Sequence, residues 1–162
     1  MRMKVLESLK DVGATYEIVD CDPSFADTAE FCSHYGYSPD ESANAILLEG
    51  KAESPIYALC VVLATTRINV NKVARKRLGT RKASFASAEV TKSLTGMEIG
   101  GVTPVGLPDN LPIWIDNLVM EAPKVIIGAG SRDAKIYLAP DNLLRLPNTH
   151  VVEGLSMPIV NK

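Results

Sequence analysis

An almost unbroken apolar run, PIYALCVVLATT at residues 55–66, constrains the fold more than any other stretch of the sequence. The run is rich in β-branched side chains, and its length suits a strand better than a helix. It lacks the polar–apolar alternation of a strand with one solvated face. We therefore predict a strand buried on both faces, which requires a sheet covered by other elements on each side.

Helical and strand-like patterns are mixed along the rest of the chain. We predict helices at 3–12, 28–35, 40–44, 72–79, 88–95 and 140–146, and further strands at 15–21, 45–50, 82–86, 111–118, 124–130, 135–140 and 149–154. Asp27 and Glu30 have the spacing of a capping box for the second helix. Because strict βαβ alternation is missing, we expect one α/β domain over residues 1–162, with a mixed β-sheet or partly closed barrel and surrounding helices.

Composition excludes several classes of protein. Hydrophobic residues make up 46% and charged residues 22% of the chain, and the net charge is −2. Nucleic-acid binding would therefore need a local basic patch. The three cysteines are widely spaced and form no CxxC pair, which favours a reducing, cytoplasmic location. We expect no membrane segment, because no apolar stretch approaches 18 residues and the start lacks a secretory signal pattern.

Motifs for nucleophilic or metal-dependent chemistry are missing from the sequence. It contains no GxSxG, HExxH or P-loop pattern, and its two histidines, His34 and His150, are far apart. Zinc-ligand spacing is therefore absent. We expect no metal and no other cofactor, and any catalysis would have to use backbone groups or the substrate itself.

The stretch GGVTPVGLP at residues 100–108 has three glycines and two prolines, which restrict or widen the backbone conformations of one loop. Its glycines allow close approach of the backbone to a ligand, and its prolines stiffen the same segment. Such a loop can present bare N–H groups to a carbonyl or an oxyanion. The alternative is a purely structural loop, and the residues alone leave both interpretations open.

Seven of the seventeen basic residues lie between positions 67 and 82, with no acidic residue among them. A cluster of this kind predicts a phosphate-binding face for a nucleic acid. The alternative is a solvated helix face, because neighbouring cations point in several directions around a helix. The cluster consists of Arg67, Lys72, Arg75, Lys76, Arg77, Arg81 and Lys82. A second glycine-rich stretch, GAGSRD at 128–133, lies between two predicted strands and indicates a hairpin turn.

The order of these segments resembles one known family. NVNKVARKRLG, KASFASAEVTKSLTGMEIGGVTPVGLP, LPIWIDNLVME and VIIGAGSRDAKIYLAPDNLLRL follow one another as in that family, from about Thr28 to Leu146. The central loop carries the GxxxP pattern from Gly100 to Pro104. The chain resembles the editing (insertion) domain of bacterial prolyl-tRNA synthetases and its free-standing relatives, the YbaK-type aminoacyl-tRNA deacylases.

This resemblance implies a reaction and a site. In the family, the ester that joins a mischarged amino acid to the terminal ribose of tRNA is hydrolysed. The loop backbone, here Gly100, Gly101, Val102 and Thr103, would hold the substrate carbonyl, and Pro104 would fix the loop geometry. The substrate's own hydroxyl or thiol assists. A small residue such as alanine or cysteine on tRNA for proline is the substrate that the resemblance implies.

The resemblance also implies further site residues and partners. Thr28 and Asp116 would line the pocket, although Thr28 could instead be an N-cap and Asp116 a strand-end residue that contacts a backbone N–H. Asn44 occupies the position where the family usually carries a lysine. The acceptor end of aminoacyl-tRNA is the expected partner, with an aminoacyl-tRNA synthetase as a further candidate. The phosphates of the tRNA would contact the basic face at Arg67, Lys72, Arg75, Lys76 and Arg77. Because Asn44 cannot neutralise a phosphate, two hypotheses stay open: a deacylase, or a weakly catalytic module that binds tRNA or a small ligand.

Overall fold

The structure is a computed structural model that describes residues 2–159, and its largest sheet is mixed. Its five strands lie in the order β5 (Ala83–Phe85), β2 (Ala43–Gly50), β3 (Ile56–Leu63), β6 (Ile113–Asp116) and β9 (Thr149–Val152). The β5–β2–β3 pairs are antiparallel, whereas β6 and β9 continue the sheet in parallel. The predicted mixed sheet in an α/β fold is thus confirmed.

A smaller antiparallel sheet contributes one wall of the cavity that is described below. Its order is β1 (Glu17–Asp20), β8 (Ala134–Leu138) and β7 (Val125–Gly128). A parallel bridge between Ser42 and Ile126 joins this sheet to the start of β2. The last two strands, β4 (Thr66–Ile68) and β10 (Ser156–Pro158), form a separate antiparallel pair.

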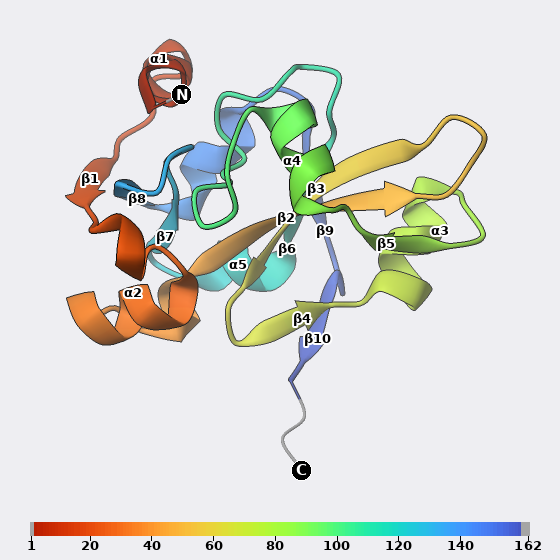
Figure 1. The fold of residues 1–162 in the computed structure, drawn as a ribbon. Coiled ribbons are helices and arrows are strands. Elements are labelled where there is room, and N and C mark those ends of the chain that lie inside the picture. The colour runs from red at the N-terminus through yellow and green to blue at the C-terminus, as the bar shows by residue number, and fades with distance from the viewer. Residues whose placement is uncertain (1, 160–162) are drawn as a thin grey trace.

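Short helices surround the sheets (Figure 1). They are α1 (Arg2–Asp11), α2 (Thr28–Tyr35), α3 (Arg75–Leu78), α4 (Ala88–Thr95) and α5 (Asn117–Glu121), with single turns at η1 (Pro23–Phe25), η2 (Pro39–Glu41), η3 (Val70–Ala74) and η4 (Pro140–Arg145). Figure 1 shows α2 and the three-stranded sheet at one end of the molecule, and α3 with β5 at the other. Within residues 2–159, none of these helices has the length and apolar character that crossing a membrane requires.

The central strand β3 is buried on both faces, as its apolar run predicts. Leu59 and Val61 belong to the larger core cluster, whereas Cys60 and Val62 point into a second cluster on the opposite face. Burial also raises the pKa of the Cys60 thiol to about 12. This cysteine is therefore a packing residue and stays protonated at neutral pH.

Three local predictions differ from the structure. The expected helix at 40–44 is a single turn, η2, because residues from Ala43 onward form a complete ladder with β3. The capping box lies at Ser38 and Glu41, which begin that turn. Asp27 occupies the N-cap position of α2 without a side-chain cap bond, because its carboxylate binds an arginine instead. The expected strand at 111–118 ends at Asp116, where α5 begins.

Candidate functional site

A cavity of about 260 Å³ lies where α2, the start of β2, the loop after α4 and the three-stranded sheet meet. Its walls are mainly aliphatic and include several small side chains. The lining comprises Ala26, Asp27, Thr28, Phe31, Ser42, Ala43, Asn44, Ala45, Ile46, Leu47, Ala86, Thr91, Ile99, Gly100, Val102, Ile126, Ile127, Gly128 and Lys135. A cavity of this size suits an aminoacyl-sized group better than a whole nucleotide.

Two residues singled out in the sequence meet at this cavity. The Thr28 hydroxyl donates a hydrogen bond of 2.6 Å to the side-chain oxygen of Asn44. Thr28 is the first residue of α2, and Asn44 lies in β2 opposite Val62. The β2 ladder therefore fixes Asn44, and the hydrogen bond fixes the first turn of α2 against it.

The glycine-rich loop contributes only part of its length to the cavity. Gly100 and Val102 line it, whereas Gly101, Thr103 and Pro104 are buried outside the lining. The Gly101 N–H donates to the carbonyl of Glu98. Within residues 2–159, the N–H groups of Gly100 and Val102 have no acceptor. These two amides are donors that the loop could offer to a ligand in the cavity.

The loop and the β7–β8 turn approach each other backbone to backbone. The Gly130 N–H donates to the Gly101 carbonyl at 2.7 Å. A Cβ atom on Gly101 would lie 2.7 Å from the Ser131 carbonyl oxygen, and one on Gly128 only 2.4 Å from that of Val102. Side chains at these two glycines would therefore separate the segments. GAGSRD is the hairpin turn that the sequence predicts, and it also holds the loop.

Arg132 in this turn ties three segments together. Its guanidinium donates to the Ile99 carbonyl at 2.6 Å, to the Pro23 carbonyl at 2.9 Å and to the Asp27 carboxylate at 3.2 Å. Gly100 lies against it with a φ of +93°, and a Cβ there would be 2.2 Å from a guanidinium nitrogen. The planar guanidinium group of arginine can donate hydrogen bonds to several neighbouring oxygens at once. Sequence reasoning missed this role because all three partners are distant in the chain.

Lys135 brings a cation into the cavity, and sequence reasoning missed it too. Its ammonium donates to the Gly100 carbonyl at 2.7 Å and lies 5.6 Å from the centre of the Phe31 ring. Gly128 is directly opposite Lys135 in the β7–β8 ladder, so both residues face the same side of the sheet. Because Gly128 has no side chain, the loop can pack against it, and the neighbouring Lys135 binds the loop at Gly100. A lysine within the apolar strand sequence AKIYL was the available signal.

Burial lowers the pKa of the Lys135 ammonium from its ordinary value. The side chain is only 6% exposed, and desolvation is the largest cause of the shift. Within residues 2–159, no carboxylate lies within ion-pair distance of its nitrogen. The lysine is thus a buried cation held by a carbonyl oxygen and an aromatic ring.

The cavity offers donors and a cation, and its serine hydroxyl makes no hydrogen bond to a basic side chain among residues 2–159. Ser42 lines the cavity, and its hydroxyl lies 3.2 Å from the Cys32 sulfur. A serine nucleophile needs a neighbouring histidine or an equivalent base, and no histidine lines the cavity. Across residues 2–159, no group of His, Cys, Asp and Glu side chains is arranged to hold a metal ion.

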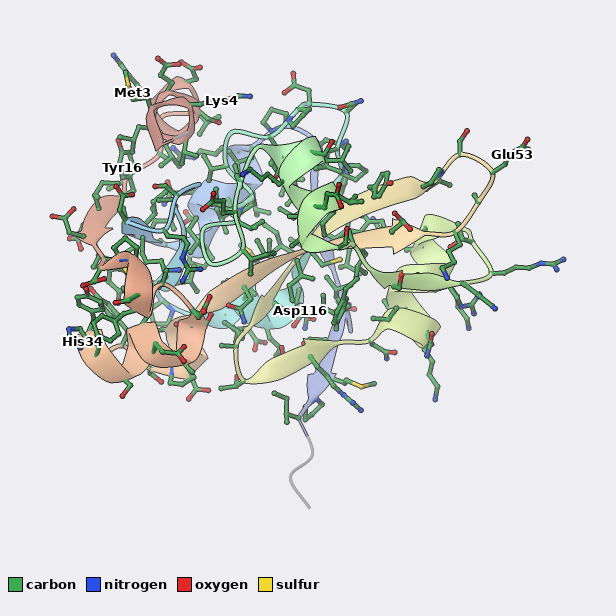
Figure 2. All side chains as sticks on the ribbon, viewed as in Figure 1. Met3, Lys4, Tyr16, His34, Glu53 and Asp116 are labelled. Carbon is green, nitrogen blue, oxygen red and sulfur yellow. The ribbon has the colours of Figure 1, made fainter. Side chains whose placement is uncertain are left out.

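Asp116 lies away from this cavity, in contrast to the expectation from the resemblance. It is fully buried at the end of β6, and its carboxylate accepts hydrogen bonds from the hydroxyl and the backbone N–H of Ser156. Figure 2 shows Asp116 in the interior of the molecule, apart from α2. In this structure Asp116 anchors β10 to the sheet.

The basic cluster is only partly a single surface. Lys51, Lys72, Arg75, Lys76, Arg81 and Lys82 line one open hollow, which we call the basic hollow. Arg77 instead lies over the Trp114 ring, 5.2 Å from its centre, and Arg67 is exposed in β4. Lys51, at the end of β2, joins the hollow through the fold and not through sequence proximity. Of the five residues predicted to contact tRNA, the structure therefore brings together three: Lys72, Arg75 and Lys76.

The chain belongs to the aminoacyl-tRNA editing domain family, whose model matches residues 22–146. This range includes the cavity, the loop and the basic hollow. The recognition of the fold from segment order is thus confirmed.

Individual relatives agree with this assignment. The chain is 27% identical over 104 residues to "Putative Cys-tRNA(Pro)/Cys-tRNA(Cys) deacylase EbsC" of Enterococcus faecalis, covering 64% of this chain and 62% of that protein. It is 28% identical to "Uncharacterized protein YwhH" of Bacillus subtilis over 78% of each chain. A "putative trans-editing enzyme for prolyl tRNA synthetase" shares its fold, with a TM-score of 0.79 at 24% identity over 94% of each chain. A crystal structure of a hypothetical protein gives a TM-score of 0.84 at 25% identity, covering 95% of this chain and 99% of that one.

We expect Gly128→Ala to lower the free energy of unfolding by about 1–3 kcal/mol, the usual cost of overpacking. Its new methyl would meet the Val102 carbonyl. Gly128 has no left-handed φ, so without this contact alanine would stabilise the protein by about 0.4–1 kcal/mol. Urea unfolding gives the sign directly. A stabilised variant would show that the two backbones are not in close contact.

We expect Arg132→Lys to loosen the loop without unfolding the protein, because one ammonium cannot replace the forked contacts. Amides at 99–103 should exchange hydrogen about tenfold faster, as the loss of about 1.5 kcal/mol of charge-assisted hydrogen bonding predicts. Hydrogen-exchange mass spectrometry measures this. Arg145→Lys is the matched control, because Arg145 donates to the Gly13 carbonyl elsewhere. Equal exchange at 99–103 in both variants would contradict the role of Arg132.

Proposed function

We propose that the protein is a free-standing, trans-editing aminoacyl-tRNA deacylase that hydrolyses the ester of a mischarged tRNA. The observation that carries this proposal is the cavity itself, whose lining combines Gly100 and Val102, with N–H groups that have no acceptor within residues 2–159, and the hydrogen-bonded pair Thr28 and Asn44. Backbone donors held rigidly at an ester carbonyl stabilise the charge that develops there. Membership of the editing family supports the same reaction.

The mechanism requires little of the side chains. The Gly100 and Val102 amides polarise the ester carbonyl, and the side-chain amide of Asn44 offers a further donor while its oxygen accepts from Thr28. A water molecule attacks the carbonyl carbon, assisted by the substrate's own hydroxyl or thiol. Positioning and electrostatics supply much of the acceleration for an activated ester. This proposal fits a cavity in which no histidine is present and the Ser42 hydroxyl is hydrogen-bonded to Cys32 and the Ser38 carbonyl.

We propose a small aminoacyl group, alanine or cysteine on tRNA for proline, as the substrate. The size of the cavity, about 260 Å³, supports a small group, and so do its alanine-rich walls. The name of the Enterococcus relative includes Cys-tRNA, which points to the same class. Apolar packing alone discriminates weakly between side chains that differ by one group, so specificity would need help from the tRNA or from a synthetase.

The basic hollow is the proposed contact for the tRNA backbone. Six cations surround it, and Lys72, Lys76 and Lys82 are exposed there. Phosphate contacts of this kind give affinity and position the acceptor end, whereas the cavity selects the aminoacyl group. Arg75 is partly committed to the fold, because it donates to the carbonyls of Asn71 and Thr80.

A binding module with the same cavity is the second candidate. It is favoured by Asn44 at the position where the resemblance implies a lysine, because asparagine supplies no positive charge. Such a protein would bind tRNA or a small ligand and release no amino acid.

Deacylation assays with a panel of mischarged tRNAs separate the two candidates. We expect release of alanine or cysteine from tRNA for proline well above the uncatalysed rate, and little release from correctly charged prolyl-tRNA. Release is measured by the loss of radiolabelled aminoacyl-tRNA. Binding without hydrolysis of any member of the panel would reject the deacylase and leave the binding module.

We expect Lys76→Glu/Lys82→Glu to weaken tRNA binding and to flatten its salt dependence. Two lost phosphate contacts should reduce the slope of log K against log salt by about 1.5–2. Lys4→Glu/Lys10→Glu makes the same charge change on α1, which lies at the opposite end of the molecule from α3, and should leave the slope unchanged (Figures 1 and 2). Fluorescence titration over a salt series measures both. An equal loss in the two double variants would exclude the basic hollow.

A further inference from the structure

The Lys135 ammonium is a buried charge inside the cavity. It is buried, lines the cavity and has no carboxylate within ion-pair distance among residues 2–159. Burying a charge costs free energy unless it is compensated, and proteins rarely retain one without a partner. One of its three protons is given to the Gly100 carbonyl. The other two have no acceptor among the described residues and remain available to a ligand.

We infer that Lys135 is a catalytic residue whose ammonium stabilises the negative charge developing on the ester carbonyl oxygen in the cavity. This inference rests on the proposed deacylase function. Lys135 reaches the loop segment that supplies the free Gly100 and Val102 amides, so a carbonyl oxygen held by those amides would lie near the ammonium. Because the ammonium itself is buried, its charge acts more strongly than it would in solvent.

The reaction balances with water as the only co-substrate. The water oxygen adds to the ester carbonyl carbon, and the electron pair of the C=O double bond moves onto the carbonyl oxygen, next to Lys135. The C=O double bond then re-forms from that electron pair as the C–O bond to the ribose breaks. The ribose oxygen takes up the proton that the water has lost, giving a free amino acid and a free ribose hydroxyl. Lys135 keeps its protons throughout and acts only through its charge and hydrogen bond.

The alternative ligand for Lys135 is a phosphate of the tRNA terminus. Its burial argues against this, because only 6% of the residue is exposed and a phosphate would have to enter the apolar cavity. The exposed lysines of the basic hollow offer phosphates a solvated site instead. An uncharged carbonyl that becomes negative only during the reaction avoids the cost of burying an anion.

Ionisable groups from several elements face Lys135. Cys21 follows β1, Cys32 lies on α2, Asp27 precedes that helix, and Arg132 lies in the β7–β8 turn. Burial is the largest influence and lowers the pKa of Lys135, and Arg132 adds to this; Asp27 and the two cysteines act in the opposite sense. The charged form is required, so activity should fall as pH rises through this lowered pKa, at a lower pH than for an exposed lysine.

The kinetic test compares three variants on a mischarged tRNA that the native protein hydrolyses. We expect Lys135→Met to lower kcat about 10²–10³-fold, as for the loss of an oxyanion donor, with a smaller effect on KM. Lys135→Arg should retain part of kcat and move the alkaline limb of the pH profile upward, because guanidinium stays charged. Lys124→Met is the control: this exposed lysine lies over the Tyr137 ring, outside the cavity. A native kcat in Lys135→Met, or an unmoved alkaline limb in Lys135→Arg, would overturn the inference.

A binding test separates this inference from the proposed function. Two adenosine analogues serve as probes: a 3′-alanylamide, which is neutral at the carbonyl, and the corresponding tetrahedral phosphonate, which is anionic there. Calorimetry should show that the native protein prefers the phosphonate and that Lys135→Met lowers this preference at least tenfold. An unchanged preference in a folded Lys135→Met would overturn the role of Lys135 alone. Failure of the native protein to bind either analogue would overturn this inference, and failure to hydrolyse any mischarged tRNA would reject the proposed function.

Discussion

The site depends on direct contact between two stretches of backbone. The loop after α4 and the turn between β7 and β8 approach so closely that Gly101 and Gly128 have no room for a side chain. The hydrogen bond from Gly130 to Gly101 lies within this contact. Because both segments are held through their backbones, the loop keeps its shape without relying on flexible side chains. A site that uses main-chain donors needs this rigidity.

Two cations complete the contact. Arg132 binds the carbonyl of Ile99, and Lys135 binds the carbonyl of Gly100. Engaging consecutive carbonyl oxygens orients the peptide units of the loop and leaves the Gly100 and Val102 N–H groups unpaired within the described residues. Both cations come from the β7–β8 hairpin, so one supersecondary unit positions the loop and charges the cavity.

The sequence predicts most of the elements and part of the lining of the candidate site. The doubly buried strand, the helix at Thr28–Tyr35 and the hairpin turn follow from local patterns, and they match the structure. Thr28 and Asn44 are found through resemblance. Lys135 and Arg132 are missed because their partners lie about 33 to 109 residues away, and no local pattern encodes such contacts. The failed helix at 40–44 has the same cause, since pairing with β3 overrides local propensity.

The position of Lys135 also suggests a reason for an asparagine at position 44. A lysine at this position would enter the cavity from β2, whereas Lys135 enters from β8, across the bridge between Ser42 and Ile126. Two ammonium groups in one small apolar cavity would repel each other, so a cation from one wall makes a neutral residue preferable at the other. Asn44 satisfies this condition and adds a hydrogen bond to Thr28 that holds the first turn of α2. The asparagine therefore fits a cavity whose positive charge comes from the opposite sheet.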